Sequence, residues 1–204
     1  MPQKAVGKRC WGEVGEPMGA YHDREWGVPL HDDNKIFEFL ILEGMQAGLS
    51  WQLILNKREN FRRAFHGFSP RRVARYGERD LKRLLADPGI IRNRLKLRAA
   101  VNNAQRFLEV QEEFGSFDKY IWGFVGGQPI RSGLRSFKDM PPRTALSDGI
   151  SQDLKARGFK FVGSTVIYSH LQATGMVNDH LVWCFRYKEI GRLPGTGERS
   201  SQKA

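Results

Sequence analysis

Apolar residues recur at helical spacing along most of this chain, and capping residues separate the runs. In the segment 32–48, DDNKIFEFLILEGMQAG, an Asp or Asn begins a helix that is apolar on nearly every side. Such a helix is expected at the centre of the fold, because it has no face to offer to water. Ser50 then caps a second predicted helix, from Trp51 to about Phe65, and Gly67 ends it.

Shorter predicted helices follow. Ser69-Pro70 is a good start for the short helix RRVARY, and ERDLKRLLAD forms another that stops at Pro88-Gly89. A long helix is expected from about Asn93 to Phe114. Ser116 and the segments SDGISQDLKARG and STVIYSHLQATG indicate at least three more. Because alternating strand patterns are nearly absent, the predicted fold class is all-α.

The charge of the chain indicates a polyanionic partner. Lys and Arg number 33 against 22 Asp and Glu, which gives a net charge of +11. Between Lys57 and Arg98 there are 14 basic and 4 acidic residues, so +10 of that charge lies in one stretch. A concentrated positive charge suits nucleic acid, although solvated helix faces that only keep a protein soluble would give the same count.

Composition excludes several other classes. The two cysteines, Cys10 and Cys184, cannot supply the four ligands of an iron–sulfur cluster within this chain, and they allow one disulfide at most. The sequence has no run of eighteen apolar residues and no apolar stretch after its first basic residues, so we expect neither a membrane span nor a signal peptide. A cytoplasmic protein, or a nuclear one in a nucleated cell, with no redox or nucleotide cofactor is the expectation.

A tight turn between two helices is the clearest local signal for a partner. In LLADPGIIRNRLKL, Gly89 permits the sharp turn, and Arg92, Arg94 and Lys96 begin the next helix. Backbone N–H groups in such a turn, from Gly89 and Ile90 onward, can hold a DNA phosphate without reading sequence. This predicts a helix-hairpin-helix unit around residues 78–114. An ordinary pair of antiparallel helices, which needs no ligand, is the alternative.

Four residues near the two ends of the chain suit a metal site. Cys10 and His22 are twelve positions apart, and His180 and Cys184 are four apart, which is one side of a helix. A Cys₂His₂ set is the usual closed structural zinc site, although neither half has zinc-finger spacing and all four could be ordinary buried residues. The other histidines have no cysteine partner and are interpreted as structural or surface residues: His31, His66 and His170.

Longer strings carry a family resemblance. RCWG, AYHDREWGVP, LEGMQAGLSW, DPGIIRNRLK and GFKFVGSTVIYSHLQATGMVNDH, with the closing Cys184, resemble the DNA-3-methyladenine glycosylase I family. The resemblance implies one helix-hairpin-helix glycosylase unit over residues 9–187, with flexible tails at 1–8 and 188–204. It also implies a structural Zn²⁺ that joins the N- and C-terminal segments of a helical bundle.

Site residues follow from the same resemblance. Zinc ligands fall on Cys10, His22, His180 and Cys184. Glu43 falls on the carboxylate that recognises the damaged base, and Tyr21 and Trp51 fall on the aromatic pocket. Gly48 and Leu49 belong to the segment that fills the gap left by the flipped nucleotide.

The chain departs from the family pattern at two places near its start. Cys10 and Trp11 are adjacent, where the family often has one residue between them, and Met18-Gly19 precedes the AYHD string in place of an aromatic. The resemblance still implies that Trp11 is a wall of the base pocket, displaced by one position from the family pattern.

The implied activity is hydrolytic release of free 3-methyladenine from alkylated double-stranded DNA, by a monomer that acts at the nucleoid. A base that carries a positive charge is already a good leaving group, and aromatic faces and a carboxylate would select it. No lysine falls in a matched pocket string, so no lyase activity is expected. The alternatives are a non-catalytic zinc-stabilised protein that binds DNA or senses alkylation damage, and a helical scaffold that binds RNA.

Overall fold

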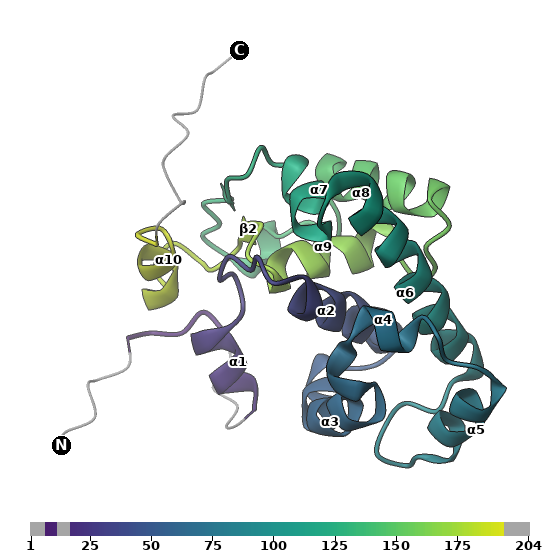
Figure 1. Ribbon diagram of the computed structural model, residues 1–204. Helices are drawn as coiled ribbons and strands as arrows, with labels where there is room; N and C mark the ends of the chain where they lie inside the picture. Colours follow the sequence, from purple (N-terminus) through teal and green to yellow (C-terminus); the bar gives the residue numbers. More distant parts are fainter. Residues whose placement is uncertain (1–6, 12–16, 194–204) are drawn as a thin grey trace.

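The computed structural model describes residues 7–11 and 17–193, and helices dominate both its fold and its core (Figure 1). Predictions that fall on residues 1–6, 12–16 and 194–204 lie outside the described residues. The helices and strands, in chain order, are α1 (Met18–Arg24), α2 (Asp33–Gln46), α3 (Trp51–Ala64), η1 (His66–Phe68), α4 (Pro70–Val73), α5 (Glu78–Ala86), α6 (Arg94–Phe114), α7 (Phe117–Gly123), β1 (Ile130–Arg131), η2 (Phe137–Asp139), α8 (Ala145–Ala156), α9 (Ser164–Ala173), β2 (Val177–Asn178) and α10 (Phe185–Ile190).

Helix α2 is the central element, as its apolar pattern predicts. Every residue from Ile36 to Met45 is buried, and the helix packs against α3, α6, α7 and α9. The Asp32 side chain accepts a hydrogen bond from the Lys35 N–H at 2.9 Å, which fixes where the helix begins. Ser50 caps α3 in the same way, through the Leu53 N–H at 3.3 Å. These two predicted caps are confirmed, whereas Ser69 begins α4 without the side-chain hydrogen bond of a cap.

Aromatic rings join the long helices into one core. Phe37 of α2 meets Phe107 of α6 edge to face, with ring centroids 5.1 Å apart, and Phe107 stacks on Phe117 of α7 at 4.0 Å. Full burial of each such ring contributes about 2–3 kcal/mol. A second cluster consists of Tyr21, Trp26, Phe39, Leu55 and Ala173, and it lies where α1 meets α2, α3 and α9.

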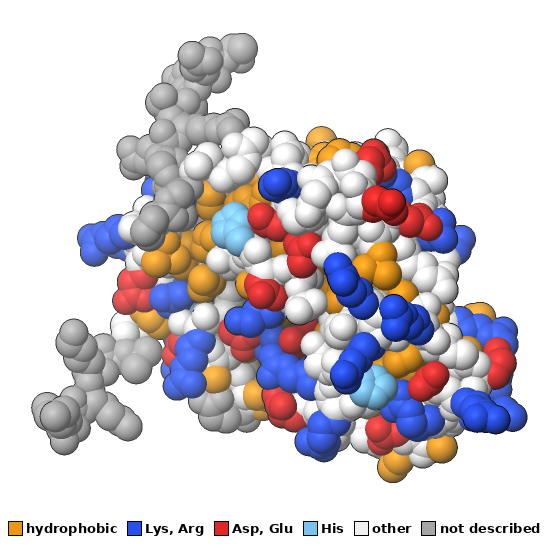
Figure 2. Space-filling view, in the orientation of Figure 1, with side chains coloured by type: hydrophobic (Ala, Val, Ile, Leu, Met, Phe, Trp, Pro, Cys, Tyr) orange, Lys and Arg blue, Asp and Glu red, His pale blue; other side chains and the backbone are white. Residues whose placement is uncertain are grey.

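Some of the basic residues in the stretch 57–98 make ion pairs or hydrogen bonds within the protein. Figure 2 shows Lys and Arg side chains gathered over α3, α4 and α5, with acidic side chains among them. Arg83 pairs with Asp80 at 3.4 Å, and Arg98 pairs with Glu78 at 3.2 Å. Lys96 is turned inward and donates to backbone carbonyls. The excess charge of the stretch 57–98 therefore overstates the positive surface that it offers to a partner.

Two helices and two strands were not indicated by the sequence pattern: α1, α10, β1 and β2. Helix α1 begins after Pro17 without a side-chain cap, and α10 begins after Cys184 without one. Helix α10 ends at Ile190, which is buried, so ordered structure continues past residue 187. Strands β1 and β2 pair in parallel over two residues each, which is too short to give a visible alternation. The chain is otherwise all-α as predicted, and among the described helices none is long and apolar enough to cross a membrane.

Candidate active site and metal centre

A cavity of ≈ 220 Å³ lies where α1, α2, α9 and the start of α3 meet. Aromatic rings form much of its wall: the centroids of Tyr21 and Trp51 are 5.4 Å apart, and those of Trp11 and Tyr21 are 6.1 Å apart. The residues that line it are Trp11, Met18, Tyr21, Trp26, Glu43, Gln46, Trp51, Ser169 and Gln172. The space fits a flat ring that is held between aromatic faces.

Glu43 is the acidic side chain in this wall, and one of its carboxyl oxygens makes no hydrogen bond within the described part of the chain. Only 4% of the residue is exposed, and its buried Oε2 has no hydrogen-bond donor among the described residues. Burial raises the pKa of Glu43 to about 8. Trp51 contributes a second buried polar atom without a partner, the indole Nε1. Native proteins rarely leave such atoms unsatisfied, so a buried acceptor and a buried donor on two residues that line the same cavity indicate a ligand site.

Tyr21 stays neutral beside this carboxyl group. Burial, and then the negative charges of Glu43 and Glu25, raise the pKa of the Tyr21 hydroxyl well above its usual value. The hydroxyl can therefore donate or accept a hydrogen bond at any physiological pH.

A buried ion-pair network holds the helices around the cavity. Arg58 of α3 donates to Glu38 of α2 at 2.5 Å and to Glu25, directly after α1, at 2.7 and 2.8 Å. Its guanidinium also lies over the Phe39 ring, 4.9 Å from the centroid. This network ties α1, α2 and α3 together, so the cavity walls are positioned before any ligand binds.

Beside the cavity, the four predicted metal ligands come together from the two ends of the chain. The Cys10 Sγ lies 3.3 Å from the His22 Nε2 and 3.5 Å from the His180 Nδ1. The Cys184 Sγ lies 3.5 Å from each of the same two nitrogens. The four ligand atoms all lie within 4.8 Å of one another, so the cluster could hold a metal ion.

Neighbouring groups orient both histidines of this cluster. The His22 Nδ1 is 2.7 Å from Asp23, whose carboxylate is held in turn by Arg9, and the His180 Nε2 is 2.9 Å from the Trp26 carbonyl oxygen. With each outer nitrogen engaged, the inner nitrogens are free to bind a metal. The hydrogen bond from Cys10 lowers the pKa of the Cys184 thiol.

Trp11 belongs to both sites. Its ring meets His22 edge to face with centroids 4.9 Å apart, lies 5.1 Å from the Trp26 ring, and also lines the cavity. Trp11 therefore lies between the cluster and the cavity, although Cys10 and Trp11 are adjacent. Met18 also lines the cavity, at the position where the family often has an aromatic.

The segment after α2 is exposed and its position is fixed. Gly48 has φ 79°, a left-handed conformation that suits glycine, and Leu49 is 39% exposed. Lys96 caps the end of α2 by donating to the Met45 carbonyl at 2.8 Å and to the Ala47 carbonyl at 2.6 Å. The helix that follows the hairpin therefore holds the segment that carries Leu49.

The hairpin offers both charge and free N–H groups. Arg92 and Arg94 are exposed, whereas Ile90 is buried and anchors the turn. The Gly89 N–H is not available to a phosphate, because it donates to Asp87 Oδ1 at 2.7 Å. A side-chain carbon at Gly89 would lie 2.8 Å from that same oxygen, so a larger residue there would displace the Asp87 side chain. Within the described residues, the N–H groups of Ile91 and Arg92 have no acceptor.

Sequence reasoning missed part of the cavity wall. Gln46 stands three residues after Glu43 on α2, so helical spacing could have pointed to it. No comparable signal marks Trp26, Ser169 or Gln172, because α9 reaches the cavity only through tertiary packing. The remaining histidines lie outside this wall: His31 pairs with Asp118 at 2.8 Å, His66 with Tyr76 at 2.5 Å, and His170 is buried on α9.

Comparison with known proteins gives a consistent result. The family model described as methyladenine glycosylase matches residues 11–187. The chain is 47% identical to DNA-3-methyladenine glycosylase 1 of Escherichia coli (strain K12) over 181 residues, which cover 88% of this chain and 97% of that protein. A crystal structure of 3-methyladenine DNA glycosylase I superposes with a TM-score of 0.84 at 48% identity, over 87% of this chain and 98% of the other. A variant of 3-methyladenine DNA glycosylase I, solved in complex with 3-methyladenine, gives a TM-score of 0.83 at 34% identity, over 94% of this chain and 98% of that one.

Proposed function

This chain belongs to the methyladenine glycosylase family, and we propose that it is a monofunctional DNA glycosylase that releases 3-methyladenine from alkylated duplex DNA. The observation that carries this proposal is the aromatic cavity in which Glu43 Oε2 and Trp51 Nε1 are both buried without a partner. A flipped purine would supply a hydrogen-bond donor for Glu43 Oε2 and an acceptor for Trp51 Nε1.

The charge of the lesion explains why such a pocket would choose it. Methylation of the ring makes the base cationic while it is attached to the sugar, and the faces of Tyr21, Trp51 and Trp11 attract a cation by about 0.5–2 kcal/mol each. Glu43 can accept a hydrogen bond from the purine edge, and this contact is charge-assisted for a cationic base. Neutral adenine would gain less from each of these interactions.

The reaction then needs little help from acids or bases. Water attacks the anomeric carbon of the sugar, the N-glycosidic bond breaks, and its electron pair neutralises the departing 3-methyladenine. The water's oxygen stays on the sugar and one proton goes to solvent. The described residues that line the cavity include no lysine, so a Schiff base and strand cleavage are not expected.

We further propose that the metal of the Cys₂His₂ cluster is a structural Zn²⁺. For Zn–S bonds of about 2.3 Å and Zn–N bonds of about 2.0 Å, a tetrahedron has sulfur–nitrogen edges of about 3.5 Å. The four edges between cysteine and histidine atoms are 3.3 to 3.5 Å. Because four protein ligands fill a tetrahedral shell, the ion would supply no catalytic water, and its effect would be to hold the two ends of the chain together.

The DNA contacts fit the same proposal. Leu49 is exposed at the end of α2 and would fill the space left by the flipped nucleotide, while Gly48 keeps the backbone close to the duplex. Arg92, Arg94 and the free N–H groups of the hairpin would hold phosphates. We expect the protein to act as a monomer at the nucleoid.

The direct test is base release from methylated duplex DNA. The wild-type protein should release 3-methyladenine without cutting the strand, and Glu43→Gln should slow release about a hundredfold by removing the charge-assisted contact. Glu112→Gln, an exposed site on α6, is the matched control and should retain full activity.

A second outcome would favour the other candidate function. A folded, metal-loaded protein that binds duplex DNA but releases no base would be a DNA-binding or damage-sensing protein, and Glu43 would then affect only recognition.

A further inference from the structure

The loop at residues 158–162, between α8 and α9, holds an aromatic side chain in an unusual conformation. Phe161 has φ 55°, in the left-handed region that a bulky residue rarely adopts. Such a conformation persists only where the surroundings impose it, and it is often found at a functional contact.

Side chains from two helices impose this conformation. The Asn103 Nδ2 of α6 donates to the Lys160 carbonyl at 2.8 Å, and the Asn103 Oδ1 accepts from the Lys160 N–H at 2.8 Å. Ser151 of α8 donates to the Val162 carbonyl at 2.6 Å. The residues on both sides of Phe161 are therefore fixed, and the loop is rigid before any partner arrives.

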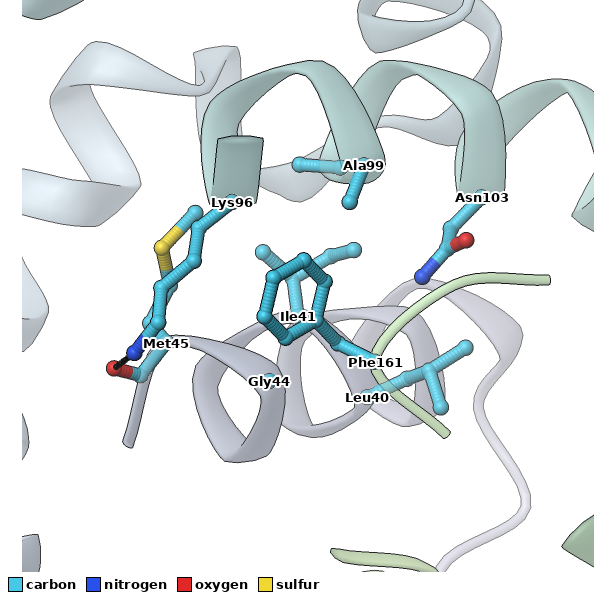
Figure 3. Close-up of a pocket in the computed structure, with 9 residues that line it drawn as sticks. Leu40, Ile41, Gly44, Met45, Lys96, Ala99, Asn103 and Phe161 are labelled. Atoms are coloured by element: carbon cyan, nitrogen blue, oxygen red, sulfur yellow. Dashed lines mark hydrogen bonds between the residues drawn. The ribbon is translucent and has the colours of Figure 1, made fainter. Parts of the chain in front are cut away.

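The ring lies in the groove between α2 and α6 (Figure 3). It covers Gly44, where a side-chain carbon would lie 3.5 Å from the Phe161 Cβ. Even so, 39% of Phe161 remains exposed. The Phe161 ring therefore packs against α2 and α6 on one side and is open to solvent on the other.

The open side carries features that suit DNA. Phe161, Leu95, Lys160 and Arg98 line a cavity of ≈ 480 Å³. Leu95 is 70% exposed and is the second residue of α6, directly after the hairpin. An apolar surface flanked by cations and continuous with the hairpin matches a nucleic acid, which presents base faces beside phosphates.

The geometry of α2 indicates which strand this surface would meet. Glu43 and Gln46 face the base cavity, whereas Leu40, Ile41 and Gly44 lie against Phe161. At 100° per residue the centres of these two sets are roughly 140° apart around the helix, so they occupy different faces of it. Phe161 is therefore across α2 from the pocket that would receive the flipped base.

We propose that Phe161 stacks on the base opposite the lesion, left without its partner by flipping, while Lys160 contacts a phosphate of the same strand. This inference rests on the proposed function, because it takes duplex DNA as the ligand. An extruded nucleotide leaves its partner base with an unpaired edge and a weakened stack, and an aromatic ring can restore the stacking on any base. Because the ring is already ordered, little conformational entropy is lost on contact.

The experiment uses a duplex with a stable tetrahydrofuran abasic analogue opposite the fluorescent base 2-aminopurine. Wild-type protein should bind it and quench the 2-aminopurine fluorescence by stacking. Phe161→Asn should bind about fivefold to a hundredfold more weakly and lose the quench, since each aromatic stack is worth that much. Asn tolerates the left-handed conformation.

Phe124→Asn is the matched control, because Phe124 is also 39% exposed but lies after α7, away from the loop. It should match the wild type in both readouts. Binding of free 3-methyladenine should be unchanged in both variants, because neither touches the base cavity. Lys160→Gln keeps the backbone hydrogen bonds to Asn103 and should lower the slope of log affinity against log salt by about 1.

The outcomes separate the two proposals. This inference alone would be overturned if Phe161→Asn bound the duplex and quenched its fluorescence like the wild type. If Phe161→Asn does not fold, an unchanged salt slope in Lys160→Gln would overturn it. A wild-type protein that does not bind the duplex would contradict the proposed function and this inference with it.

Discussion

The Cys₂His₂ cluster and the base cavity are adjacent, but the buried polar groups of the cluster have hydrogen-bond partners in the described part of the chain and two of those in the cavity do not. In the cluster, the outer nitrogen of His22 has Asp23 as its partner and that of His180 has the Trp26 carbonyl. In the cavity, Glu43 Oε2 and Trp51 Nε1 are just as buried and have no partner among the described residues.

This difference separates polar groups that stabilise the fold from those that serve a ligand. A buried group that has its partners strengthens the structure, whereas an unsatisfied one lowers stability until a ligand arrives. Removing a polar group should therefore lower the stability of the fold in the cluster and raise it in the cavity.

The largest effect is expected at the cluster. His180→Ala should lower the free energy of unfolding by about 4 kcal/mol, because it removes a metal ligand and leaves the Trp26 carbonyl without its partner. Denaturant unfolding of the metal-loaded protein measures this. His31→Ala, at an exposed pair with Asp118, should cost less than about 1 kcal/mol. Equal melting temperatures with and without a chelator would contradict a structural metal.

A smaller effect of opposite sign is expected in the cavity. Burial raises the pKa of Glu43 from 4.5 to about 8, so between these pH values the folded chain keeps a proton that the unfolded chain has released. Wild-type stability therefore falls as pH rises through this window.

Gln cannot ionise, so Glu43→Gln should exceed the wild type in unfolding free energy by a few kcal/mol at pH 9, with the gap closing toward pH 4. Urea unfolding across this range is the measurement, with Glu112→Gln as the exposed control. A constant gap would mean that Glu43 does not titrate in this window.

The smallest effect on stability is expected at Trp51. Because its indole N–H has no partner to lose, Trp51→Phe should change the unfolding free energy by less than about 1 kcal/mol. Its affinity for free 3-methyladenine should nevertheless fall about fivefold, since Trp51 lines the cavity and Phe offers a smaller aromatic face without an N–H. Calorimetric titration checks this, and Trp183→Phe, at an exposed ring, should bind like the wild type.

The sequence predicted the elements that carry their own local signals. Asp32, Ser50 and Asn93 cap helices where expected, because the donor N–H of each lies three residues further along. Helices α1 and α10 have no such caps. They are held by the contacts of the Cys₂His₂ cluster and by packing between the chain ends, which no local pattern reveals.

The residues of the site also divide into those that the sequence predicted and those whose role depends on tertiary packing. Glu43, Tyr21, Trp51 and Trp11 were carried over from family strings, and the structure brings all four to one cavity. Lys96 was interpreted as one more cation of the hairpin, but it caps α2, because those carbonyls lie beside the start of α6 only in the folded chain.

The ring of Trp11 has a wider consequence, since it packs on His22 and also closes the cavity. Two binding events that share a wall are linked, and linkage is reciprocal: whatever factor the ion adds to base affinity, the base must add to the affinity for the ion. A metal ion in this cluster that raised the affinity for the base would therefore itself be bound more tightly while a lesion occupies the cavity.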